Sequence, residues 1–144
     1  MNLTGIWKGS FRYGKGYPSI FIGKSEPFQL NLMDNDGILT GFCIDKIVTA
    51  FEGNESTIEG IFKDNYISFI KKYKFQAIID ESNNTVLADD SIKSDGIHYV
   101  GHSYKRFFRN KIYFEGEWHL TTEYIEGNEK LYHSVEGTWT MSKM

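Results

Sequence analysis

Cysteine, proline and long apolar runs are what this chain of 144 residues has least of. Cys43 is the one cysteine, which excludes an intramolecular disulfide and suits a reducing compartment. No apolar run approaches the roughly 20 residues that a membrane-spanning helix needs. The chain opens on a strand-like stretch and shows no charged and then apolar leader. We therefore expect a cytoplasmic protein, and its net charge of −3 is ordinary for a soluble chain.

Aromatic residues and glycines are abundant where proline and cysteine are rare. Aromatics make up 16% of the chain, and fourteen glycines stand against two prolines. Aromatic residues favour strands and glycines mark bends and turns, so the composition indicates an all-β protein. The length fits one domain, and no shift in composition divides residues 1–144.

Period-two alternation, punctuated by Gly, Asn and Asp, predicts eight strands and no helix. The predicted strands span residues 3–13, 27–33, 37–46, 56–63, 65–75, 96–105, 111–123 and 133–142. Four turn signals join neighbouring strands, at 34–37, 63–66, 108–111 and 126–130. Short strands joined mostly by hairpins predict an eight-stranded antiparallel up-and-down β-barrel, with a β-sandwich as the alternative.

Two predicted loops are long. Residues 14–26 are partly apolar, and we expect them to fold over a barrel mouth. Residues 80–95 are acidic and polar, and we expect them to be mobile.

A glycine stands two residues before a large or reactive side chain in six of the predicted strands. Residues i and i+2 of a strand point to the same side, so each pair shares a face with its apolar neighbours, the interior face. The pairs are Gly5–Trp7, Gly41–Cys43, Gly60–Phe62, Gly101–Ser103, Gly116–Trp118 and Gly137–Trp139. An inward glycine lets a strand bend or leaves room beside a ring, which favours a curved, closed barrel over unrelated strand glycines.

The same parity turns other side chains to solvent. On the seventh predicted strand these are Tyr113, Glu115, Glu117, His119, Thr121 and Glu123. His98 and His102 also point outward.

Several inward positions are polar or carry large rings, and buried polar groups need partners. The candidate ligand-binding residues are Trp7, Cys43, Asp45, Lys71, Tyr73, Tyr99, Ser103, Trp118 and Trp139. Converging polar groups in an aromatic-lined concavity are typical of a small-molecule site. The alternative places Asp45, Lys71 and Ser103 at strand ends, solvated at the barrel rim.

Three stretches resemble strands of avidin and streptavidin: "LTGIW" (3–7), "GILTGFC" (37–43) and "EWHLTT" (117–122). The opening Gly-x-Trp is also similar to the lipocalin signature, and the overall pattern looks closest to small, uncharacterised bacterial lipocalin-like proteins. The resemblance implies a calycin-type barrel. "WKG" followed by "GYP" resembles the nitrobindin haem barrels as well, but those need an inward histidine, so we expect no haem.

The ligand chemistry of avidin does not carry over with this resemblance. Cys43 and Asp45 stand where that family has a Tyr and a Ser, and Gly9 stands where it has an Asn. Trp139 replaces the last-strand Asp, and Trp118 keeps the family's inward ring. A site built by hydrogen bonds to a small polar head fails once most donors and acceptors are gone, so we do not expect biotin.

Other chemistries find little support. His98 and His102 lie about 13 Å apart along a strand, too far to share a metal ion, and Glu117 with His119 would need a cross-strand partner. "IKKYKF" (70–75) and "YKRFFRNK" (104–111) mix basic and aromatic residues as single-strand nucleic-acid binders do, but the chain is acidic overall. No nucleophile–base arrangement indicates an enzyme.

We therefore predict a barrel that binds a small, partly apolar molecule inside, with no cofactor, no metal and no nucleic-acid or membrane partner. The alternative is an interaction module whose filled barrel presents its outer surface to another protein. The long strands 111–123 and 133–142 and the outward Ile6 and Ile61 are compatible with a homo-oligomer, because avidin-like barrels associate through such faces.

Overall fold

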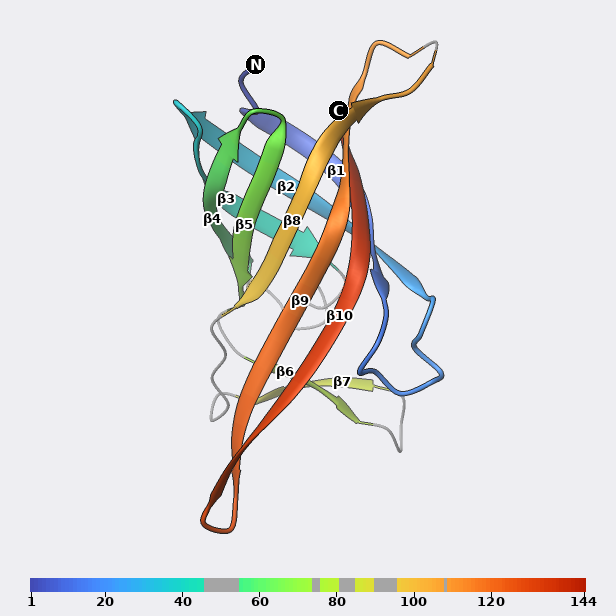
Figure 1. Cartoon of the computed structure of the whole chain (residues 1–144), viewed down its shortest axis with the longest axis vertical. Coiled ribbons are helices and arrows are strands. Elements are labelled where there is room, and N and C mark those ends of the chain that lie inside the picture. Colours follow the sequence, from blue (N-terminus) through green and yellow to red (C-terminus); the bar gives the residue numbers. More distant parts are fainter. Residues whose placement is uncertain (46–54, 74–75, 81–84, 90–95, 108) are drawn as a thin grey trace.

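The computed structural model describes residues 1–45, 55–73, 76–80, 85–89, 96–107 and 109–144, with backbone alone for 76–80 and 85–89. Eight antiparallel strands close into a barrel in the order β1-β10-β9-β8-β5-β4-β3-β2 (Figure 1). They are β1 (Gly5–Tyr13), β2 (Ser25–Asn35), β3 (Ile38–Asp45), β4 (Ser56–Lys63), β5 (Tyr66–Lys72), β8 (Ile97–Lys105), β9 (Ile112–Glu126) and β10 (Glu129–Lys143). The described residues form no helix long and apolar enough to cross a membrane.

The strand order confirms the predicted up-and-down barrel and excludes the sandwich. Every barrel strand pairs with its neighbours along the chain, and β1 closes the ring against β10 from Trp7↔Lys143 to Tyr13↔Gly137. The turns after β2 and β4 use left-handed residues, Asp36 and Gly37 in one and Asp64 and Asn65 in the other.

One expectation was wrong. The loop predicted at residues 80–95 contains strand β7 (Thr85–Asp89), which pairs with β6 (Gln76–Asp80) as a separate two-stranded sheet. The run Thr-Val-Leu-Ala in β7 is typical of a strand, but it is short and lies among acidic and polar residues, whose composition favours a loop. The rest of that predicted loop lies outside the described residues.

Strands β9 and β10 continue beyond the barrel as a two-stranded ribbon, which we call the arm (residues 121–134) (Figure 1). The pairing of β8 with β9 ends at His98↔His119, and the pairing of β1 with β10 ends at Tyr13↔Gly137. An ion pair between Lys130 and Glu123 (2.8 Å) and a hydrogen bond between Thr121 and Ser134 (3.0 Å) join its two strands.

The interior face is the one that parity predicted. The core includes Leu3, Trp7, Phe11, Leu39, Cys43, Ile58, Tyr99, Phe114, Trp118, Val135, Trp139 and Met141, all buried. Two glycines make room for its rings: a Cβ at Gly101 would lie 2.7 Å from Cζ2 of Trp139, and one at Gly137 would lie 2.5 Å from Nε1 of Trp118. The inward glycines therefore serve the packing that the sequence predicted for them.

Tyr113 corrects the predicted solvent face of β9. It lies on the outer side of the barrel but is buried, because the Tyr104 ring stacks on it at 5.5 Å and the Arg106 guanidinium covers it at 4.6 Å. Parity gives the side of the sheet on which a residue lies, but not which side chains of the neighbouring strand and the preceding turn cover it.

Candidate functional site

One mouth of the barrel is covered by the connection between β1 and β2. Tyr17 and Phe21 of this connection pack against the core, as expected for a loop that folds over the mouth. Main-chain hydrogen bonds hold it in place, from Gly14 to Glu136 (2.9 Å), from Glu136 to Lys15 (3.0 Å) and from Gly23 to Tyr13 (2.9 Å). We call residues 14–24 the cap.

Beneath the cap, the ends of β3 and β5 bring an ion pair into the interior. Nζ of Lys71 donates to Oδ2 of Asp45 at 3.0 Å, and the two side chains are 2% and 0% exposed. The Tyr73 hydroxyl donates to the same carboxylate oxygen. The alternative in which Asp45 and Lys71 are solvated at the rim is therefore wrong.

Three aromatic rings surround the Lys71 ammonium, and we call them the aromatic cage (Phe11, Tyr73 and Tyr99). Nζ lies 5.1 Å from the Phe11 centroid, 5.0 Å from that of Tyr73 and 5.3 Å from that of Tyr99. Ring faces carry negative potential, so each attracts the cation, and the attraction grows when water is excluded. The cage and Asp45 together replace the water that the ammonium lost on burial.

The pKa values at this site shift with burial and charge. Burial alone lowers the pKa of Lys71, but the surrounding Tyr73, Tyr99, Cys43 and Asp45 outweigh it and raise that pKa well above its usual range. Burial raises the pKa of Tyr99 to about 12 and that of Cys43 to about 11. Lys71 therefore stays charged and is no nucleophile at neutral pH.

A second group of rings leads from the cap down to the cage. Tyr17 lies 4.8 Å from Tyr13 and 5.9 Å from Trp118, and Phe11 lies 5.4 Å from Tyr13 and 6.2 Å from Trp118, all edge to face. The Trp118 indole donates to the carbonyl oxygen of Arg12 at 3.3 Å. Burial, and then the charge of Glu26, raise the pKa of Tyr13 to about 12.

The predicted site residues separate into two groups. Asp45, Lys71, Tyr73, Tyr99 and Trp118 come together at the mouth, with the buried Cys43 among the groups that act on Lys71. Trp139 lies beside Tyr99, at 5.8 Å between ring centroids.

The remaining two predicted residues lie elsewhere. Trp7 packs on Phe114 at 5.5 Å and donates to the Leu3 carbonyl oxygen, deep in the other half of the barrel. Ser103 is next to His102, which pairs with Tyr66 at the end of β5 opposite to Lys71. Parity places residues on the interior face but not at a depth along the barrel axis, so Ser103 was assigned to a site that it does not reach.

Four residues of the site were not among the predicted site residues: Tyr17 and Phe21 of the cap, and Phe11 and Tyr13 of β1. The partly apolar composition of 14–26 was the one signal for the cap. No periodicity identifies which of its side chains turn inward.

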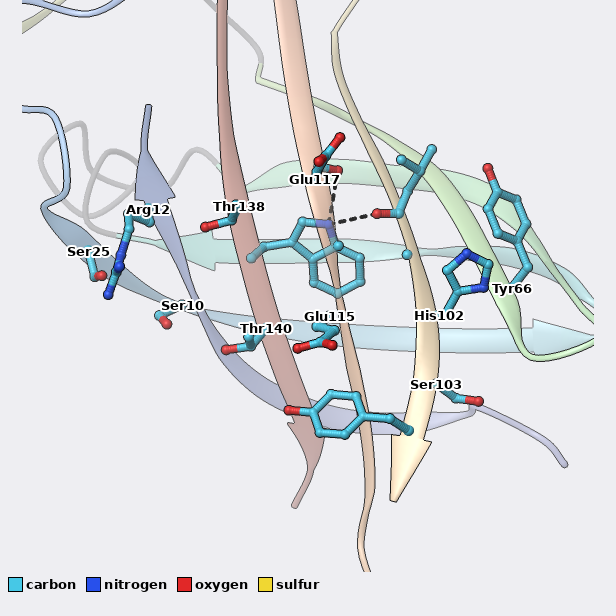
Figure 2. Close-up of a pocket in the computed structure, with 15 residues that line it drawn as sticks. Ser10, Arg12, Ser25, Tyr66, His102, Ser103, Glu115, Glu117, Thr138 and Thr140 are labelled. Atoms are coloured by element: carbon cyan, nitrogen blue, oxygen red, sulfur yellow. Dashed lines mark hydrogen bonds between the residues drawn. The ribbon is translucent and has the colours of Figure 1, made fainter. Parts of the chain in front are cut away.

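A separate groove of about 740 Å³ lies on the outer face of the barrel (Figure 2). Glu115 and Glu117 of β9 and Thr138 and Thr140 of β10 line its centre, and Arg12 lies at one side. Beneath the groove, the indole nitrogen of Trp139 donates to the carbonyl oxygens of Val100 (3.1 Å) and Glu117 (3.0 Å). This groove is not the interior pocket that the sequence predicted.

Metal chemistry finds no support at either place. Among the described residues, no three His, Cys, Asp or Glu side chains are grouped to hold a metal ion. His98 and His119 stack on each other at 5.0 Å on the outer surface, which agrees with their predicted outward direction.

Comparison with known proteins gives likeness of fold alone. No protein-family model matches the chain, and no curated protein matches it. Among solved structures, the rhizavidin–biotin complex is similar, with 13% identity, a TM-score of 0.47, and coverage of 95% of this chain and 92% of the other. The short afifavidin–biotin complex is also similar, with 14% identity, a TM-score of 0.45, and coverage of 93% and 87%. The eight-stranded antiparallel up-and-down barrel inferred from the sequence is present, and it is established by the strand order and register of this chain.

Proposed function

We propose that the barrel binds a small molecule at the capped mouth, with the polar end of the ligand toward Lys71, Asp45 and Tyr73. The observation that carries this proposal is the buried Lys71 ammonium, held by one carboxylate and three rings at the end of the barrel where the cap lies. Buried charged groups with strongly shifted pKa values are typical of functional sites.

The energetics support a functional role for this pair. Removing two ions from water costs several kcal/mol for each ion, and well-packed apolar residues of similar volume are often as stabilising or more so. The other interior positions of the barrel are apolar or aromatic almost throughout. An ion pair at this one end is therefore better explained by binding than by stability.

The surroundings of the pair define the class of ligand. Lys71 and Asp45 neutralise each other, so the site favours a molecule without net charge at its inner end. The rings of Tyr13, Tyr17 and Trp118, which pack edge to face on one another beneath the cap, would line the flat, partly apolar body of such a ligand. We do not propose biotin, because Cys43 and Asp45 stand where the avidins have the Tyr and Ser that bind the ligand's head.

A dye titration tests this proposal. An environment-sensitive apolar dye should gain fluorescence with the wild-type protein, and Asp45→Ala and Trp118→Ala should weaken its binding. His98→Ala is the matched control, because His98 lies on the outer surface and should leave binding unchanged. Equal affinity in all four proteins would refute the proposed site. Tyr17→Ser, a change in the cap, keeps the test valid if a barrel variant fails to fold, and it too should weaken binding.

A second candidate function is a protein-interaction module with a filled interior. Two observations favour it: the described interior rings pack on one another, and every buried side-chain polar atom among the described residues has a hydrogen-bond partner. Ile38 and Ile61 are also paired across β3 and β4 on the outer face, 63% and 52% exposed. Absence of dye binding, together with a stable complex lost in an Ile38→Ser/Ile61→Ser variant, would favour this function.

A further inference from the structure

The turn between β8 and β9 is strongly basic, although the chain as a whole is acidic. From Val100 to Phe114 the sequence has four Lys or Arg residues and no carboxylate. Lys105, Arg106, Arg109 and Lys111 are all exposed, and Phe107 between them is 87% exposed. We call these five residues the cationic tip.

The cationic tip projects from the barrel at the end opposite to the candidate binding site. Strand β5 pairs Tyr66 with His102 and Lys71 with Ile97, so β8 leads away from Lys71 toward the tip. Figure 1 shows the turn extending past the other hairpins at the end where the C-terminus lies. The ion pairs Lys71–Asp45 and Lys130–Glu123 both lie away from the tip.

Lys8 of β1 adds one exposed positive charge to the outer face near the base of the turn. Lys8 of β1 pairs with Ser142, which pairs with Tyr113, which pairs with Tyr104, so these four lie in one row across the sheet. The Arg106 guanidinium lies over the Tyr113 ring at 4.6 Å. This contact holds the base of the turn against the sheet and keeps the tip directed away from the barrel.

We propose that the cationic tip binds the surface of a bilayer that contains anionic phospholipids. The charges of tip and surface are complementary, and each Lys or Arg near an anionic leaflet strengthens binding about fivefold. The exposed Phe107 supplies apolar surface that can enter the boundary between headgroups and acyl chains. The basic residues and the apolar ring thus act on the same surface, the first through charge and the second through burial. For this surface the proposal replaces the sequence-based expectation of no membrane partner.

Single-stranded nucleic acid fits this surface less well. Such binders stack successive bases on open aromatic faces along a basic groove. Here Tyr104 and Tyr113 stack on each other, and the Arg106 guanidinium lies 4.6 Å from the Tyr113 ring centroid. Tyr104 and Tyr113 therefore already contact side chains of the protein and do not form a row of open rings on which successive bases could stack.

Vesicle sedimentation tests the proposal with the full chain. The protein should sediment with vesicles of equal parts phosphatidylcholine and phosphatidylserine, far less with phosphatidylcholine alone, and less as salt is raised. Arg109→Gln/Lys111→Gln should weaken binding about 25-fold, since two cations are lost. Phe107→Ser should weaken it about tenfold, from the loss of one buried ring.

A control with the same change in charge is available at the end of the barrel opposite to the tip. Lys72→Gln/Lys130→Gln removes two exposed cations, one from the end of β5 beside Lys71 and one from the arm, and should leave vesicle binding as in the wild type. Equal weakening by both double variants would overturn the proposal, because net charge and not the tip would then govern binding. No sedimentation with anionic vesicles would also overturn it, and binding of a labelled single-stranded RNA in its place would assign the tip to nucleic acid.

Discussion

Lys71 and Asp45, 26 residues apart in the chain, meet inside the barrel with 3.0 Å between Nζ and Oδ2. Their strands, β3 and β5, are separated in the sheet by β4. The contact therefore forms only once three strands are in register, and it links the fold to the candidate site.

Removing one member of this ion pair should lower the free energy of unfolding. Lys71→Met takes the counter-charge away from the buried Asp45 carboxylate, which keeps its hydrogen bond from Tyr73, and we expect the free energy of unfolding to fall by about 3–5 kcal/mol. The double variant Lys71→Met/Asp45→Leu removes both charges and should recover much of that loss, because apolar side chains pack well among the surrounding rings.

Urea unfolding of the wild type, Lys71→Met, Asp45→Leu and the double variant gives the interaction energy of the pair directly. We expect the double variant to have a higher free energy of unfolding than Lys71→Met. A double variant less stable than both single variants would mean that the pair is needed for the fold itself, and the energetic argument for a binding role would fail.

Alkaline pH should destabilise the fold through the same cluster. The pKa of Tyr99 is raised to about 12 and that of Cys43 to about 11, and the pKa of Lys71 is raised as well. A raised pKa means that the folded state keeps a proton that the unfolded state has lost. The contribution of these three groups to the free energy of unfolding is complete at neutral pH and is lost as pH rises from about 9 to 12.

The measurement is the urea midpoint as a function of pH. Between neutral pH and about 9 these groups should leave it unchanged, and above that it should fall steeply. Tyr99→Phe removes one titrating group and should make the fall shallower. The same steepness in Tyr99→Phe would show that this phenol titrates alike in the folded and unfolded chains.

The sequence predicted the barrel well and the site in part, for separable reasons. Strand parity correctly turned Trp118 and Lys71 inward, because a strand's two faces depend only on local alternation. It could not place Ser103 along the barrel axis, since depth depends on the stagger between strands. It also gave no information on Tyr17, whose direction is set by the hydrogen bonds of the cap and not by a repeat.

Tyr113 was placed on the correct side of the sheet but with the wrong exposure. Strand parity correctly predicted that it points outward, yet Tyr104 and Arg106 cover its ring. Long amphipathic side chains can bury a neighbour on the outside of a sheet, and no local pattern reports this.

The close packing over Gly101 should tolerate no added methyl group. A Cβ there would lie 2.4 Å from the Glu115 carbonyl oxygen and 2.7 Å from Cζ2 of Trp139. We expect Gly101→Ala to lower the free energy of unfolding by about 1–3 kcal/mol, because ring and backbone must both shift. Thr140→Ala, on the exposed outer face nearby, should change it by less than about 0.5 kcal/mol. A neutral Gly101→Ala would contradict the role assigned to the inward glycines.

The arm should open more readily than the barrel strands from which it continues. Within the barrel, residues 113–118 of β9 pair on both sides, with β8 and β10, whereas residues 123–126 pair with β10 alone. The ion pair at its end, Lys130–Glu123, is exposed and adds little. An isolated two-stranded ribbon is marginally stable in water. Hydrogen exchange should therefore be fast for amides of 123–132 and slow for 113–118, with His119 as the boundary. Equal protection along the whole of β9 would show that another chain or segment covers the arm in solution.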